Sequence, residues 1–213
     1  MRLYLSSFDV GNRPDELVAL APGGRVGLVM NALDNRPEGR AIWQSRQAAR
    51  LRDLGFSVEE LDLRKFFDAP GTLGPRLDGL DMVWINGGNT FILRRAMRAS
   101  GFDREIVGRL HADRIAYAGF SAATVILAPS LRGLEAVDDP ADVPPDYPEP
   151  TDWEGLAILP FAVVVHYRSN HAESAAVEGE VAFYEREGMA YRTLGDGQAM
   201  VVNGAIDTMR VVG

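Results

Sequence analysis

The segment around Ser121 combines a serine with the small residues that a tight strand-to-helix turn requires. Residues 117–123 read Tyr-Ala-Gly-Phe-Ser-Ala-Ala. At such a turn the serine hydroxyl is exposed, and the positions two before and two after it must be small because the backbones crowd together. Gly119 and Ala123 satisfy this requirement, and the amide of Ala122 is a candidate oxyanion donor. The pattern indicates a nucleophilic serine, and a helix N-cap is its alternative role.

A nucleophilic serine needs a base, and the base needs an acid that fixes its tautomer. The chain offers three imidazoles, at His111, His166 and His171. His166 follows the apolar run 161–165 and is therefore expected at a strand end, where the active sites of α/β proteins collect. Asp196, in the turn sequence Gly-Asp-Gly, is the first candidate for the acid, and Glu173 and Glu178 are the alternatives.

A second turn carries paired glycines directly after an apolar run. Residues 86–89 read Asn-Gly-Gly-Asn, and glycines at a strand end let the backbone approach a ligand closely. The amide of Gly88 is therefore a candidate second oxyanion donor. Asn89 is a candidate helix N-cap and a candidate substrate contact. The glycine spacings of nucleotide-binding loops and the His-Glu-x-x-His pattern are absent, so we expect neither a cofactor nor a metal.

The elements that must position these residues alternate between strand and helix, which predicts a mostly parallel α/β sheet covered on both faces. The expected strands are 2–6, 25–31, 57–63, 81–86, 114–119, 157–165, 191–194, 198–202 and 209–212, and the expected helices are 38–54, 90–99, 103–112 and 172–187.

Length and composition suit a single soluble domain over residues 1–213. The formal net charge of −8 argues against a nucleic-acid partner, and the absence of cysteine excludes a cysteine nucleophile. No apolar run approaches the roughly 18 residues of a membrane span, so we expect no membrane association. No export signal is evident at the start, and the cytoplasm is the expected location.

Residues 135–154 depart from the pattern, because they contain five prolines and eight acids but no lysine or arginine. We expect an exposed acidic loop within the domain rather than a linker, since the strand expected after it needs the preceding sheet. Long loops of this kind are often functional. A solvated loop without a role is the alternative.

Four motifs together resemble one known family. They are 85–93 (Ile-Asn-Gly-Gly-Asn-Thr-Phe-Ile-Leu), 118–123 (Ala-Gly-Phe-Ser-Ala-Ala), 159–167 (Leu-Pro-Phe, then His-Tyr) and 195–198 (Gly-Asp-Gly-Gln). In order and spacing they are similar to the dipeptidase E, or aspartyl dipeptidase, family of serine peptidases, to which cyanophycinase is related.

The resemblance implies an α/β three-layer sandwich of the class I glutamine amidotransferase type. It also implies that Ser121 is the nucleophile and His166 the base, with Asp196 where many members have glutamate. The oxyanion amides would come from Gly88 and Ala122.

One departure from the family concerns the substrate. Aspartyl-specific members carry an arginine early in the helix after the histidine, whereas residues 171–178 contain none. Arg168 and Arg132 are then the candidates for holding a substrate carboxylate. We therefore predict a serine exopeptidase that hydrolyses short peptides through an acyl-enzyme, with aspartyl specificity in question. A carboxypeptidase-like member and a catalytically silent binding protein remain open, as do a monomer and a homodimer.

Overall fold

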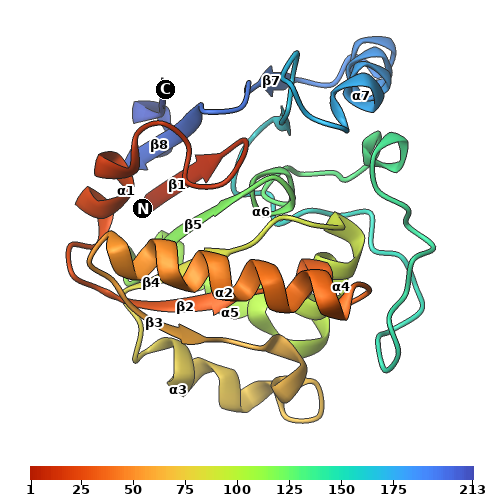
Figure 1. Ribbon diagram of the computed structural model, residues 1–213. Helices are drawn as coiled ribbons and strands as arrows, with labels where there is room; N and C mark the ends of the chain where they lie inside the picture. Colours follow the sequence, from red (N-terminus) through yellow and green to blue (C-terminus); the bar gives the residue numbers. More distant parts are fainter.

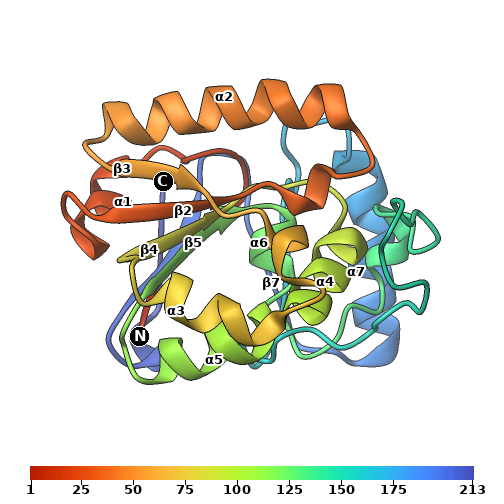
Figure 2. The same cartoon turned by 90° about the horizontal axis from the view of Figure 1, so that it is seen from below.

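The computed structural model describes residues 1–213 as a sheet between two layers of helices (Figures 1 and 2). Its seven strands lie in the order β3-β2-β4-β5-β1-β8-β9. The first five of these are parallel, and β8 and β9 close the sheet in antiparallel fashion. The strands are β1 (Arg2–Ser6), β2 (Arg25–Val29), β3 (Ser57–Glu60), β4 (Met82–Ile85), β5 (Ala116–Phe120), β8 (Ala199–Asn203) and β9 (Arg210–Val212). The prediction of a three-layer, mostly parallel α/β sandwich is confirmed.

The helices divide between the two faces of the sheet, as Figure 2 shows with α2 on one side and α3 and α5 on the other. They are α1 (Pro14–Leu20), α2 (Pro37–Asp53), α3 (Leu73–Leu77), α4 (Thr90–Ser100), α5 (Phe102–His111), α6 (Ala122–Val125) and α7 (Ser174–Glu187). Alternate side chains of a strand point to opposite faces. In β4, Met82 and Trp84 accordingly join the core under α1 and α2, and Val83 and Ile85 join the core under α3, α4 and α5. None of the helices combines the length and apolar content needed to cross a bilayer.

The prediction of a strand over 157–165 in the main sheet is wrong, both in the length of the strand and in the strand with which it pairs. Only β6 (Ala162–Val164) is extended, and it pairs in parallel with β7 (Tyr191–Thr193) in a separate two-stranded sheet. The earlier part of the segment bonds elsewhere, since the amides of Leu156 and Ile158 donate to the carbonyls of Ile126 and Leu127 at 2.8 and 3.0 Å. These bonds draw the backbone away from the main sheet.

The acidic segment 135–154 is less exposed than the sequence indicates. It runs beside α4 without a long helix or strand, as the green-to-teal stretch in Figure 1. Its apolar residues turn inward, because Tyr147 is buried and Val143 and Trp153 pack against the core. Asp152 pairs with two arginines of α4. The segment is thus a strap held to the domain.

Candidate active site

Ser121 occupies the sharp turn between β5 and α6. Its φ of 52° and ψ of −115° are a conformation that non-glycine residues rarely adopt and that active sites retain. The crowding expected at this turn is present, since a Cβ on Gly119 would lie 2.3 Å from the carbonyl oxygen of Ile85 and 2.6 Å from the Cβ of Ala123. The serine therefore has the geometry of a nucleophile elbow.

His166 and Asp196 are brought together by the small β6–β7 sheet. His166 follows β6 and Asp196 follows β7, and the pairing continues past both strands through the bond from the Tyr167 amide to the Leu194 carbonyl at 3.0 Å. As a result, Nδ1 of His166 lies 2.7 Å from Oδ1 of Asp196. Of the acids considered from the sequence, Asp196 holds the ring nitrogen, and Glu178 pairs instead with Arg168.

Ser7 is hydrogen-bonded to both members of the His166–Asp196 pair, and the sequence did not predict this contact. Its Oγ accepts a hydrogen bond from the backbone N–H of His166 at 2.8 Å and lies 2.9 Å from Oδ1 of Asp196, to which it can donate. The signal in the sequence was a polar residue directly after β1, at the sheet edge where ligands bind. Ser7 therefore ties the first strand to both members of the pair.

The environment of His166 favours the neutral form of its imidazole. The residue is only 1% exposed, and burial lowers its pKa, an effect that the hydrogen bond to Asp196 opposes and the neighbouring His171 reinforces. A neutral imidazole bonded through Nδ1 to a carboxylate leaves Nε2 free to accept a proton. His166 can thus act as a general base at neutral pH.

Ser121 and His166 line the same cavity, which has a volume of about 300 Å³. One side of it is aromatic, because the ring of Phe8 lies 6.0 Å from His166 and 5.8 Å from Phe120, centroid to centroid. The polar side is formed by Arg36, Asn86, Gly87, Gly88 and Glu173. The cavity lies beyond the carboxyl ends of the adjacent strands β4, β5 and β1, as expected for this class of fold.

One candidate oxyanion donor, Ala122, directly follows Ser121 in the chain, and the other, Gly88, lines the same cavity as Ser121. Ala122 is the first residue of α6, where helix amides have no acceptor within the helix. The amide of Gly88 donates to no backbone carbonyl. Gly88 has a φ of 144°, and a Cβ there would lie 2.5 Å from the carbonyl oxygen of Ala32, so this loop admits only glycine.

The three residues predicted to contact substrate lie outside this cavity. Asn89 caps α4, accepting hydrogen bonds from the amides of Phe91 and Ile92 at 2.9 and 3.0 Å. Arg132 stacks on Trp153, and Arg168 stacks on Tyr167.

The arginine that does line the cavity is Arg36, the residue directly before α2. It forms no ion pair within 4 Å, but it lies close enough to Asp138 to oppose the rise that burial causes in the pKa of that carboxyl. Arg36 could not be chosen from the sequence, because only the fold brings residue 36 to the cavity that Ser121 lines.

Comparison with known proteins assigns the chain to a family. The model of peptidase family S51 matches residues 41–209, which include Ser121, His166 and Asp196. The chain belongs to peptidase family S51. The S51 chain is 32% identical over 148 residues to peptidase E of Streptomyces coelicolor, a match that covers 70% of this chain and 53% of the relative. It is 29% identical over 119 residues to an uncharacterized peptidase of Listeria monocytogenes, covering 56% of this chain and 55% of that one. It spans about half the length of the curated relatives it matches.

Solved structures show the same fold. A candidate peptidase E from Listeria monocytogenes superposes with a TM-score of 0.81 at 22% identity, covering 99% of this chain and 97% of that one. A peptidase from an acI-B1 actinobacterium superposes with a TM-score of 0.71 at 15% identity, covering 100% and 87% of the two chains. The three-layer fold of this S51 member is therefore shared across nearly its whole length.

His171 and Glu173 add possible metal ligands beside His166 in this S51 chain. The donor atoms of the three residues lie within 4.8 Å of one another. However, the two imidazoles are stacked, with centroids 3.7 Å apart and planes 7° from parallel, so their in-plane lone pairs do not converge on one ion. Nδ1 of His171 also accepts a hydrogen bond from the amide of Glu173. The arrangement fits a metal poorly.

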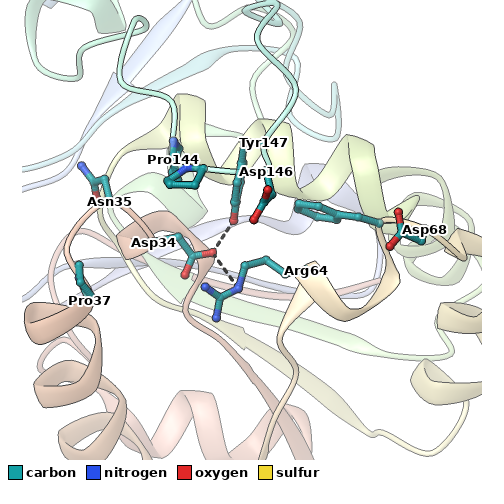
Figure 3. Close-up of a pocket in the computed structure, with 10 residues that line it drawn as sticks. Asp34, Asn35, Pro37, Arg64, Asp68, Pro144, Asp146 and Tyr147 are labelled. Carbon is teal, nitrogen blue, oxygen red and sulfur yellow. Dashed lines mark hydrogen bonds and ion pairs between the residues drawn. The ribbon is translucent and has the colours of Figure 1, made fainter.

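The largest cavity of the S51 chain lies elsewhere. It has a volume of about 710 Å³ and contains no nucleophile–base pair (Figure 3). The Tyr147 hydroxyl and Arg64 both point toward Asp34, which also binds Arg40 at 2.8 Å. Size alone therefore does not locate the active site.

Proposed function

We propose that the protein is a serine exopeptidase that hydrolyses short peptides through an acyl-enzyme. One observation carries the proposal: a strained serine at a strand-to-helix turn shares a cavity with a buried histidine bonded to an aspartate. This is the constellation of a nucleophile, a base and an orienting acid, which is recognised by its geometry on any fold. Membership of family S51 supports the same chemistry.

In the first half of the reaction, Oγ of Ser121 attacks the peptide carbonyl carbon and passes its proton to Nε2 of His166. Asp196 stabilises the imidazolium that forms and holds the ring in place. The amides of Gly88 and Ala122 receive the negative oxygen of the tetrahedral intermediate. Loss of one such donor typically lowers the rate by ~10²–10³.

In the second half, His166 gives the proton to the leaving amine as the peptide C–N bond breaks. Water then attacks the acyl-enzyme, with His166 again accepting a proton. His166 returns this proton to Oγ of Ser121 as the ester bond breaks and the acid product leaves. The lowered pKa of His166 favours this role, since the imidazole must be neutral at the start of each half-reaction.

Arg36 is our candidate for recognition of a substrate carboxylate. Its guanidinium is exposed, has no ion pair and lines the cavity that holds Ser121. A carboxylate at the leaving-group end of a short peptide would form a charge-assisted pair with it. Arg36 thereby replaces Arg132 and Arg168 in this role, and it serves a dipeptidase and a carboxypeptidase-like enzyme equally.

Reaction with a neutral fluorophosphonate, followed by peptide mapping, tests the proposal. We expect the label on Ser121, no label in Ser121→Ala, and at least a thousandfold loss of peptide hydrolysis in that variant. Ser130→Ala is the matched control, because this serine lies outside the cavity and should be dispensable. Hydrolysis that survives Ser121→Ala would overturn the proposal.

A further inference from the structure

The cavity that holds Ser121 has an aromatic wall that the proposed mechanism does not use. The rings of Phe8, Trp43 and Phe120 form it, and each pair of ring centroids is between 5.8 and 6.1 Å apart. Phe120 is buried, whereas Phe8 and Trp43 are half-buried at the edge of the core. The accessible part of the wall is therefore a pair of rings from two elements, the loop after β1 and the helix α2.

This wall lies beside the reacting groups. The ring centroid of Phe8 is 6.0 Å from that of His166, and Phe120 directly precedes Ser121 in the chain. Apolar walls with a few placed polar groups are typical of small-molecule sites. The cavity volume of about 300 Å³ is at the lower end of the range for such sites, so it suits one or two residues of a peptide.

Helix α2 brings a cation to the same cavity. Arg36 directly precedes the helix and Trp43 lies seven residues later, which is two turns, so both are on one face of α2. Both residues also line the cavity. Two turns rise about 11 Å, a span that an arginine side chain and one aromatic amino acid bridge together. A substrate residue whose carboxylate pairs with Arg36 can therefore lay its side chain on the aromatic wall.

The charges around Trp43 select against a charged side chain on that residue. The guanidinium of Arg46 lies over the indole, with Cζ 4.8 Å from the ring centroid, so the ring already holds a cation. Arg46 and Arg36 would both repel a lysine or arginine side chain. An acidic side chain would lose its hydration against the rings, and Arg46 already pairs with Asp9 at 3.4 Å. Among large side chains, an aromatic or aliphatic one fits best.

We propose that Phe8 and Trp43 form the subsite for the leaving-group residue of the substrate and select an aromatic or large aliphatic side chain there. This inference rests on the proposed function, because the leaving-group residue of a short peptide is the one that carries the terminal carboxylate. The substrate class is thus a short peptide that ends in an apolar residue such as phenylalanine. Burial of its side chain and edge-to-face contacts with the rings stabilise the complex.

Three dipeptides test the subsite and the side of the scissile bond on which it lies. Alanyl-phenylalanine has an aromatic leaving-group residue, alanyl-glycine has no side chain there, and phenylalanyl-alanine carries the ring in the acyl half. We expect kcat/KM for alanyl-phenylalanine to exceed that of the other two tenfold or more. In Trp43→Ala this ratio should fall toward one, and Trp43→Phe should restore most of it. Ile42→Ala, which replaces a neighbouring residue that is 68% exposed, should retain the ratio.

Equal kcat/KM for the three peptides in the native enzyme would overturn the subsite, as would a preference for phenylalanyl-alanine. A purely structural role of Trp43 gives a different result from the proposed one. In that case Trp43→Ala would lower kcat/KM for alanyl-phenylalanine and alanyl-glycine by the same factor, and this outcome would also overturn the subsite.

Protection of Ser121 from the fluorophosphonate measures the subsite without turnover. Phenylalanine, as the leaving-group product, should slow the labelling at concentrations at which glycine has no effect, and Trp43→Ala should remove this protection. If Ser121 of the native protein is not labelled at all, the proposed function fails. If Ser121 is labelled but the two amino acids protect it equally, the proposed function stands and the subsite fails.

Discussion

Asp152 and Glu180 are both buried carboxyl residues, but they have opposite surroundings. Asp152, on the strap, lies 2.8 Å from Arg94 and 2.8 Å from Arg98. Glu180, on α7, lines a small cavity of about 20 Å³ together with Ser121, and its one hydrogen bond comes from the hydroxyl of Tyr184. The strap is thus held by opposite charges that compensate one another, whereas Glu180 has no cation beside it and burial favours its neutral form. This difference shows that a cation decides whether a buried carboxyl is held in its charged or its neutral form.

The acids beside the two cavities, Asp62 and Glu180, differ in the same way. Asp62 pairs with Arg64, which lines the large cavity. Burial alone would raise the pKa of Asp62, but the hydrogen bonds from Arg64 and Asn31 outweigh burial and lower the pKa to about 2. In the small cavity nothing outweighs burial, and the pKa of Glu180 rises to about 8. Two acids in one domain therefore titrate far apart because one has a cation and the other has none.

The largest effect should come from removing the cation of a compensated acid. Arg94→Met keeps the volume of the side chain but leaves Asp152 and Asp103 without a buried partner. We expect the free energy of unfolding to fall by about 3–5 kcal/mol, as for other broken buried pairs. Urea denaturation at pH 7 measures this, with the exposed Arg104→Met as the control. If the free energy of unfolding fell by less than about 1 kcal/mol, the buried pair between Arg94 and Asp152 would not be what holds the strap.

Substitution of Glu180 is expected to raise the free energy of unfolding, whereas substitution of Arg94 lowers it. Its folded-state pKa of about 8 lies above the ordinary value of 4.5. Between these values the unfolded chain releases a proton that the folded chain retains, so the stability falls as the pH rises. Glu180→Gln removes this loss and should be more stable than the native protein by a margin that grows from pH 5 to pH 8. Urea denaturation at several pH values checks it, and a constant margin would contradict the raised pKa.

Some features of the fold and of the site could be predicted from the sequence, and others could not. Most of the order of strands and helices could be predicted, because apolar periodicity is a local signal. The turn at Ser121 and the meeting of His166 with Asp196 were expected from small-residue turns and from the family resemblance, and the catalytic roles of these residues stay predictions. Short α1 and α3 were missed, since a few residues carry too little pattern.

The small cavity could not be predicted, because whether Glu180 is buried depends on which segment covers α7. Arg36 and Ser7 were missed for a similar reason: their roles arise only when distant segments meet at the sheet edge.

A smaller effect is expected in the pH dependence of catalysis. Burial lowers the pKa of His166, and Asp196, His171 and Glu173 are the titratable groups that face it. If His166 is the base, kcat/KM rises with pH as the imidazole loses its proton, and the midpoint should lie below the unperturbed 6.5. Asp196→Asn removes an interaction that raises this pKa, so the midpoint should move lower while the plateau falls. A midpoint above 6.5 for a neutral substrate would contradict the role of burial.

The smallest effect should follow from removing the exposed member of the compensated pair. Arg98 and Arg94 both pair with Oδ2 of Asp152. The Arg98 side chain is 67% exposed, whereas the Arg94 side chain is 8% exposed. Water replaces most of what Arg98 supplies, so Arg98→Ala should lower the free energy of unfolding by only about 0.2–1 kcal/mol. Adding salt should reduce the difference further, because exposed pairs are screened. Urea denaturation at low and high ionic strength measures both effects. A loss as large as that of Arg94→Met would mean that the strap depends on the number of cations around Asp152 rather than on the buried one.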